Sequence, residues 1–278
     1  MRGPASRAES DIHWDVKAAE GYGGYLDLDR LLAAQHPRSG EHDEMLFIII
    51  HQASELWMKL LLHELGAVAA GIRDDALGQP LKIFARVGRI QQQLIQSWDV
   101  LSTMTPHDYQ LLRPHLGPSS GFQSYQYREL EFRLGNKDAA LIAVHRADPP
   151  ALARLEAALA APSLYDETLR LLARRGVPVP AHALTRDVTK PYAADPDVEA
   201  AWLTVYRDVD TYWDLYDLAE KLVDLEDRFQ QWRFRHLKTV ERIIGMKGGT
   251  GGSSGVPFLA RALGMSFFPE LWSLRTKL

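Results

Sequence analysis

The sequence predicts an all-α protein, built as a single-domain helical bundle. Long stretches carry apolar residues at every third or fourth position, the spacing that places them on one face of a helix. No stretch alternates apolar and polar residues between turn dipeptides, so a β-sheet is not expected. There is no repeat of fixed period either, which argues against a solenoid.

The first half of the chain is expected to hold two long helices. From Asp43, a residue suited to an N-cap, apolar side chains recur with helical spacing. Further on, Pro106, Pro114 and nearby glycines interrupt the pattern and predict a loop. The expected elements are a mobile arm at 1–20, a turn at 22–28, helices at 28–34, 43–70 and 80–104, a loop at 106–121 and a helix at 123–147.

The second half is expected to be helical too, with one flexible interruption. Pro149 and Pro150 should end the helix before them. The segment 151–190 is rich in Ala, Leu and Arg, and we interpret it as a small helical excursion within a 21–278 domain. Residues 245–255 are too rich in glycine for a helix or a strand. The other expected elements are helices at 195–216, 218–245 and 257–264, then a tail with Trp272.

Composition and charge describe an ordinary globular protein. Of the 278 residues, 46% are hydrophobic and 24% are charged, which suffices for a packed core. The formal net charge is −4, so the bulk charge does not attract phosphate backbones or anionic lipid. No apolar run approaches the ~20 residues that span a bilayer, and the N-terminus lacks the apolar core of a signal peptide. We therefore expect a cytoplasmic protein without nucleic-acid or membrane partners.

The chain contains no cysteine, which excludes several chemistries at once. A disulfide frame, a thiolate nucleophile, an iron–sulfur cluster, a cysteine–zinc site and a covalently attached c-type haem all require that residue. Any metal must therefore be held by histidine, by carboxylate or by a cofactor.

His236 lies in the apolar stripe of the helix expected at 218–245. It shares one helix face with Phe229, Trp232 and Val240, spaced by three or four residues. A structural histidine, hydrogen-bonded to a neighbour, is the commoner reason for such a placement. The other interpretation is a ligand to a metal or to haem iron, for which neutral imidazole is the commonest protein donor. Spacing alone does not choose between them.

His51 poses the same choice on the helix expected at 43–70. It follows Phe47 by four residues, so the two side chains lie on one face and are suited to holding a flat aromatic ligand. The structural alternative is a packed histidine paired with Glu55 on the next turn. The chain has neither Glu-x-x-His nor His-Glu-x-x-His, so di-iron and zinc-protease sites have little support.

Two further features bear on ligand binding. Arg113 follows Tyr109 by four residues in the expected loop; it is either an ordinary surface arginine or a bidentate clamp for a carboxylate. The glycine-rich segment around Thr250 lacks the Gly-x-x-x-x-Gly-Lys-Ser/Thr order and follows a helix, so it is not a P-loop. It is either a flexible linker or a lid that brings backbone N–H groups and the Thr250 hydroxyl to a ligand.

Five sequence blocks stand in a characteristic order. They are YGGYL at 22–26, HDEMLFIIIHQASELW at 42–57, SSGFQS at 119–124, WRFRH at 232–236 and KGGTGGSSG at 247–255. In this order the blocks resemble the bacterial tryptophan 2,3-dioxygenases, and the resemblance extends over nearly the whole chain.

The resemblance implies an all-α subunit that binds one haem b without a covalent link and assembles as a homotetramer. His236 then corresponds to the ligand of the haem iron. The implied reaction inserts both atoms of O2 across the C2–C3 bond of the indole of L-tryptophan. It yields N-formyl-L-kynurenine, the first step of tryptophan catabolism by the kynurenine route.

The resemblance also implies the substrate contacts. Phe47 would pack against the indole, and His51, the catalytic residue, would accept a hydrogen bond from the indole N–H. Arg113 would pair with the substrate carboxylate beside Tyr109, and Thr250 would meet the ammonium and carboxylate groups. The remaining implied contacts are Ile48, Ile49 and Ile50 with substrate, Trp98, Ser120 and Gly121 with haem, and Tyr22 and Tyr25 with a neighbouring subunit's pocket.

Two other functions compete with this one. A helical binding protein that sequesters an aromatic metabolite without turnover would not need His236 in the apolar stripe. An indoleamine dioxygenase is the nearer alternative, and acceptance of D-tryptophan or other indole derivatives would distinguish it.

Overall fold

The computed structural model describes residues 21–278, so the arm predicted at 1–20 lies outside the described residues. Within that range no strand is present, which confirms the all-α prediction. The α-helices are α1 (Tyr22–Tyr25), α2 (Leu28–Leu32), α3 (Asp43–Arg73), α4 (Gly78–Leu101), α5 (Pro106–Leu116), α6 (Tyr125–Leu134), α7 (Pro149–Ala160), α8 (Leu164–Arg174), α9 (Ala181–Leu184), α10 (Pro196–Arg207), α11 (Trp213–Ile244), α12 (Val256–Leu263) and α13 (Pro269–Ser273). The short 3-10 helices are η2 (Gly121–Gln123), η3 (Ala139–His145) and η4 (Leu274–Lys277).

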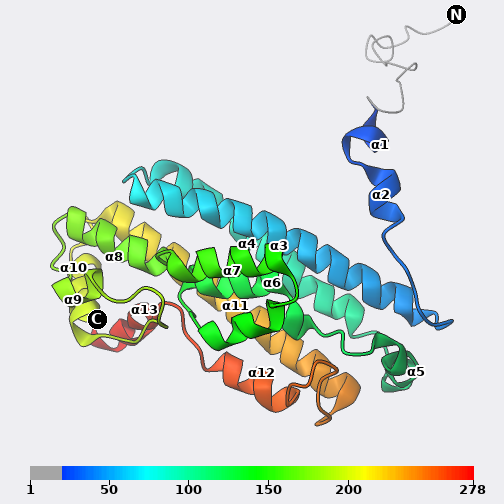
Figure 1. The fold of residues 1–278 in the computed structure, drawn as a ribbon. Helices are drawn as coiled ribbons and strands as arrows, with labels where there is room; N and C mark the ends of the chain where they lie inside the picture. The colour runs from blue at the N-terminus through cyan, green and yellow to red at the C-terminus, as the bar shows by residue number, and fades with distance from the viewer. Residues whose placement is uncertain (1–20) are drawn as a thin grey trace, which may run out of the picture.

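Three long helices form the centre of the bundle. α3 packs along α4, and α4 packs along α11 (Figure 1). Their inward faces carry the buried side chains of Leu61, Val87 and Leu222, which belong to one continuous core. The helical spacing of apolar residues therefore predicted these three helices over most of their length.

The segment 151–190, predicted as a small helical excursion, contributes to this same core. Tyr165 of α8 is fully buried in it, and its hydroxyl is held from two sides. Trp202 Nε1 donates to the hydroxyl at 2.9 Å, and the hydroxyl donates to Glu270 Oε2 at 2.7 Å. These bonds tie α8, α10 and α13 together at the end of the bundle away from α5 (Figure 1).

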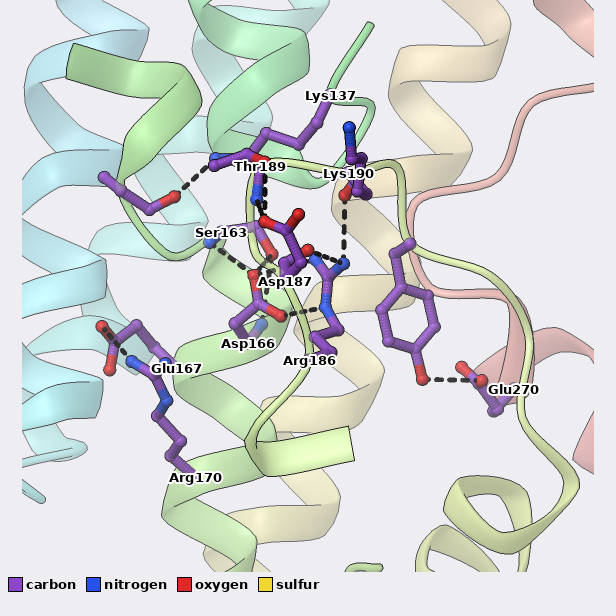
Figure 2. Close-up of polar contacts among 12 residues, drawn as sticks. Lys137, Ser163, Asp166, Glu167, Arg170, Arg186, Asp187, Thr189, Lys190 and Glu270 are labelled. Atoms are coloured by element: carbon purple, nitrogen blue, oxygen red, sulfur yellow. Dashed lines mark hydrogen bonds and ion pairs between the residues drawn. The ribbon is translucent and has the colours of Figure 1, made fainter. Parts of the chain in front are cut away.

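A second polar group fixes the start of α8 (Figure 2). Asp166 accepts hydrogen bonds from the backbone N–H and the hydroxyl of Ser163, both at 2.7 Å, as in a capping box. Arg186, from the loop after α9, places Nε 2.6 Å from Asp166 Oδ1. Burial alone would raise the pKa of Asp166, but the bonds from Arg186 and Ser163 outweigh it and lower that pKa.

The loop expected at 106–121 was the main error, because most of it is the helix α5. Pro106 opens this helix, where the missing proline N–H would have had no helical partner. Thr105 Oγ1 accepts from the Asp108 N–H, and the Asp108 carboxylate accepts from the Thr105 N–H, which completes a capping box. Pro114 falls near the end of α5. The loop prediction was wrong because it treated each proline as a helix breaker, whatever its position in the helix.

Other helix ends also differ from expectation. Pro149 and Pro150 were expected to end a helix, but they form the first turn of α7, where proline costs little. The helix expected at 123–147 breaks at Gly135, whose φ of +119° ends α6. The helix expected at 195–216 ends with α10 at residue 207.

At the start of the described chain, one helical turn, α1, occurs where only a turn was expected. Asp43 is the first residue of α3, and His42 holds the N-cap position without a side-chain cap. The segment 245–255 is free of helix and strand, as predicted.

By length and composition alone, α3 could cross a membrane, although the core helix of a soluble protein passes the same test. The inner face of α3 buries Leu61, Leu65 and Val68 against the bundle. Lys59 and His63 lie on its exposed side. This division into two faces is typical of an amphipathic core helix.

α1 and α2 project away from the bundle (Figure 1). Tyr22 and Tyr25 are 78% and 86% exposed, and Leu32 is exposed too. The chain returns to the bundle beside Gln52 of α3, whose Nε2 donates to the Ala34 carbonyl at 2.9 Å. Within residues 21–278, the side chains of both tyrosines are therefore largely uncovered.

Replacing Glu226 with Gln should destabilise the fold. The buried carboxylate, on α11, accepts from the N–H groups of Phe267 and Phe268 and from the Trp272 indole N–H. A Gln amide has one acceptor atom in place of two, so a buried N–H loses its partner at a cost of about 1–3 kcal/mol. Urea unfolding followed by far-UV circular dichroism measures the loss. The exposed Asp227→Asn is the control, and an equal loss in both variants would contradict this role.

Candidate functional site

Several predicted site residues meet at the end of the bundle where α3, α4, α5 and α11 come together. Phe47 of α3, Trp98 of α4 and Tyr109 of α5 pack around a small apolar cluster that includes the buried Leu112. The Phe47 and Tyr109 ring centroids are 6.4 Å apart. Figure 1 shows α5 and the loop that follows α11 at this end.

His236 of α11 joins this group from the other side. Its imidazole stacks on the Trp98 indole, with ring centroids 4.5 Å apart and planes 11° apart, and Trp232 packs at 5.5 Å. No residue of 21–278 forms a hydrogen bond with the ring. Burial, with a smaller effect of the neighbouring His51, lowers the pKa of His236 to about 4. The imidazole is therefore neutral at pH 7 and keeps a free lone pair.

These observations fit a haem ligand better than a structural histidine. A structural histidine would be hydrogen-bonded to a neighbour, whereas His236 leaves its lone pair unused among the residues described. The adjacent Trp98 Nε1–H is buried and has no acceptor in the described chain, a costly state for a donor. A flat macrocycle with carboxylate side chains would use both features, the lone pair for its iron and the N–H for a propionate.

His51 approaches the same space from α3. Its Nδ1 lies 2.7 Å from the Phe47 carbonyl oxygen. Because a carbonyl only accepts, Nδ1 carries the proton and Nε2 keeps the lone pair. Burial lowers the pKa of His51 against the opposing effects of the Phe47 carbonyl and Glu55, so the ring is neutral. Among residues 21–278, His51 makes no hydrogen bond to Glu55, which acts on it only through its charge and accepts from Gln126 Nε2 at 2.7 Å.

The glycine-rich loop closes onto α5 and the turn that follows it. Arg113 Nη2 donates to the Gly248 carbonyl at 2.7 Å. Thr250 Oγ1 donates to the Ser119 carbonyl at 2.5 Å. Two hydrogen bonds thus join residues that are far apart in the sequence, and they place the Thr250 segment next to Arg113.

Two glycines make this closed loop possible. A Cβ built on Gly251 would lie 2.7 Å from the Ser120 Cβ, which is closer than two non-bonded carbon atoms can approach. Gly255 has a φ of +68°, and a Cβ there would lie 2.5 Å from the Lys247 carbonyl oxygen. A larger residue at either position must push the loop out of place.

The other predicted site residues differ in whether they contact this group of side chains. Ser120 caps η2 by accepting from the Phe122 N–H at 3.3 Å, and it contacts the loop at Gly251. Ile50 packs beside Phe47 in the apolar cluster, whereas Ile49 faces outward and is 47% exposed. Ile48 is partly buried, Gly121 is exposed, and Tyr22 and Tyr25 are not brought to this end within one chain.

Sequence reasoning missed two parts of this site. The spacing of Thr105 and Asp108 matches a capping box and could have predicted α5, and with it the common helix of Tyr109 and Arg113. Ser119 was missed as the partner of Thr250, because it acts through its backbone carbonyl. Every residue type has a backbone carbonyl, so the sequence does not show which one accepts a hydrogen bond.

Fold and site together define a class, the all-α proteins that gather aromatic side chains and two neutral histidines at one end of a helical bundle. The sequence matches the family described as Tryptophan 2,3-dioxygenase over residues 8–148 and 159–278, and the chain belongs to this family. Residues 149–158, between the two matched ranges, cover most of α7.

Relatives named tryptophan 2,3-dioxygenase are similar over most of their length. That of Burkholderia pseudomallei (strain 668) is 61% identical over 264 residues, which cover 95% of this chain and 86% of the relative. That of Burkholderia mallei (strain SAVP1) is 60% identical with the same coverage of both chains.

Gly251→Val should open the loop, because the new side chain cannot share space with Ser120. Lys247, in the same loop, would then be cut more readily by trypsin, and the rate of cleavage after Lys247 measures the opening. Gly248→Ala is the matched control, since its Cβ would only make an ordinary contact of 3.4 Å. Equal cleavage of the two variants would show that the loop is not held closed by this contact.

Proposed function

We propose that this chain is a haem-dependent dioxygenase that inserts both atoms of O2 across the C2–C3 bond of the L-tryptophan indole. The product is N-formyl-L-kynurenine, which opens the kynurenine route of tryptophan catabolism. The observation that carries the proposal is the neutral His236 imidazole, stacked on Trp98 and free of hydrogen bonds within residues 21–278. The relatives named above support the same reaction.

We assign one haem b to each subunit, held by His236 with Trp98 beside it. When bound, haem supplies a redox-active iron at which O2 is activated. The protein must keep the His236 ring neutral, since an imidazolium has no lone pair to offer. Burial does this, and a pKa of about 4 keeps the ring neutral well below pH 7.

Phe47 and His51 would orient the indole. The indole N–H is a donor only, and the lone pair at His51 Nε2 is the matching acceptor. The Phe47 ring, whose centroid lies 4.2 Å from that of His51, offers an aromatic face against which the indole packs. His51 is the catalytic residue in this arrangement, because its lone pair fixes the ring and is available to the indole proton.

Arg113, Tyr109 and Thr250 would bind the amino-acid part of the substrate. Arg113 uses one N–H on the Gly248 carbonyl, and its other guanidinium N–H groups are suited to the carboxylate. Tyr109 stands one helical turn before Arg113, so its hydroxyl lies on the same face of α5. The loop holding Thr250 covers this position and would exclude water once substrate is bound.

We further propose a cytoplasmic homotetramer in which α1 and α2 of one subunit enter a neighbour's pocket. The exposure of Tyr22 and Tyr25 supports this exchange, since aromatic side chains this exposed are enriched at protein interfaces.

His236→Ala should lose the Soret band after expression with added haem, whereas His51→Ala should keep it. The first variant lacks the iron ligand, and the second lacks only the acceptor for the indole N–H. Visible spectra of the reduced proteins measure both. Haem loss from His51→Ala, with haem kept in His236→Ala, would mean that the two roles are exchanged.

The acid limb of the pH profile should lie below pH 6.5, the ordinary pKa of histidine. Protonated His51 has no lone pair for the indole N–H, so kcat/KM falls as the ring is protonated. Because burial lowers the pKa of His51, its neutral form persists to lower pH than that of an exposed histidine. Steady-state assays across pH measure the midpoint. A midpoint above 6.5, or an unchanged acid limb in His51→Ala, would contradict this role.

Arg113→Ala should raise KM for L-tryptophan by about tenfold to a hundredfold, because a hydrogen bond to a charged group is worth ~1.5–3 kcal/mol. Tryptamine, which lacks the carboxylate, serves as the control ligand. Its competition with L-tryptophan should be no weaker in the variant than in the parent enzyme. An equal loss of affinity for both ligands would mean that Arg113 does not bind the carboxylate.

A further inference from the structure

The glycine-rich loop, residues 247–255, folds back on itself. The Gly249 N–H donates to the Ser253 carbonyl at 3.0 Å. The two ends of the loop meet at its base, because a Cβ on Gly255 would lie 2.5 Å from the Lys247 carbonyl oxygen. The segment is therefore a compact loop whose ends are close together, as in Ω-loops.

The turn that receives this loop is closed by its own hydrogen bonds. We call residues 118–123 the η2 turn, after the short helix that it contains. Gln123 Nε2 donates to the Pro118 carbonyl at 3.1 Å, and the Gln123 N–H donates to the Ser120 carbonyl at 2.9 Å. The Ser120 hydroxyl accepts from the Phe122 N–H. These bonds hold the η2 turn together from its first residue to its last.

An aromatic contact joins the η2 turn to the helix that follows the loop. Phe122 packs against Phe258, in the first turn of α12, which lies along the end of α11 (Figure 1). The ring centroids are 5.5 Å apart and the planes are 79° apart, the edge-to-face geometry that aromatic rings favour. Both side chains are partly buried. Because α12 begins directly after Gly255, this contact holds the C-terminal end of the loop.

The contact at the tip of the loop is of a different kind. Thr250 Oγ1 donates to the Ser119 carbonyl, and this bond is exposed. An exposed hydrogen bond can be replaced by one to water, whereas two apolar rings that separate both gain contact with water. The tip can therefore come away from the η2 turn while Phe122 and Phe258 stay in contact.

We propose that Phe122 and Phe258 are positioning residues, which fix the base of the glycine-rich loop and so set where Thr250 closes. The loop opens when the hydrogen bonds of Thr250 and Arg113 break, while α12 stays on the η2 turn. Closing again is then favoured, because the ends of the loop remain in place and little chain entropy is lost. The effect of this arrangement on L-tryptophan binding rests on the proposed function, but the closed position of the loop does not.

Trypsin cleavage after Lys247 tests the proposal in the full-length, haem-supplemented protein without L-tryptophan, because only an open loop is cut readily. Phe258→Ala should raise the cleavage rate about threefold to tenfold, through loss of the aromatic pair. Phe258→Tyr, which retains the ring at a partly exposed position, should be cut like the parent. Phe234→Ala removes an exposed ring from α11 and is the matched control. If Phe258→Ala does not fold, Phe258→Leu takes its place.

The double variant shows whether the two rings act through their mutual contact. Phe122→Ala should raise cleavage to a similar extent, and Phe122→Ala with Phe258→Ala should be cut little faster than either single variant, since both changes remove one contact. Increases that multiply in the double variant would overturn the proposal. Cleavage of Phe258→Ala at the parent rate, or an equal increase in Phe234→Ala, would overturn it too.

Steady-state kinetics separate positioning from a catalytic role. In Phe258→Ala, KM for L-tryptophan should rise with kcat nearly unchanged, because the variant disfavours the closed loop and leaves His51 and His236 in place. A lower kcat with an unchanged KM would contradict the positioning role. Cleavage is measured without substrate, so an inactive parent enzyme would refute the proposed function and leave the cleavage test intact.

Discussion

The stack of the His236 imidazole on the Trp98 indole is the contact on which the proposed site depends. It requires α4 and α11 to lie side by side, and the shared core of the long helices provides that arrangement. Burial by this packing holds the pKa of His236 far below its ordinary value and keeps the lone pair free. The same packing leaves the Trp98 N–H without an acceptor among residues 21–278, which costs stability that a cofactor with a hydrogen-bond acceptor would restore.

The other half of the site depends on two hydrogen bonds made by a glycine-rich loop. Arg113 bonds to the Gly248 carbonyl, and Thr250 bonds to the Ser119 carbonyl. Both contacts use backbone acceptors, and their donors are two side chains proposed to bind the substrate, so the closed loop occupies one Arg113 N–H and the Thr250 hydroxyl hydrogen. The site thus combines a wall of helices, which holds the histidines, with a loop without helix or strand that two hydrogen bonds hold in place.

How far the sequence predicted this site differs from residue to residue. The shared face of Phe47 and His51 followed from helical spacing alone, because both lie on one helix. The proposed role of His236 did not follow from spacing, since a hydrogen-bonded core histidine has the same spacing. In the sequence, only the ordered blocks pointed to an iron ligand. The helix α5 was not predicted, because Pro106 and Pro114 were taken as helix breakers. The Thr105–Asp108 capping box shows that a helix begins there, and proline is tolerated in the first turn of a helix.

The sequence by itself determined the all-α fold, the long helices and the faces that they bury, because these follow from contacts between residues three and four apart. The tertiary structure alone decided which groups meet between helices: His236 on Trp98, Arg113 on the glycine-rich loop, and the Gln91 amide on the Leu225 carbonyl. Each of these contacts joins positions far apart in the chain. Whether a buried polar atom has a hydrogen-bond partner between two helices depends on how the helices pack, which the spacing of residues within one helix does not determine.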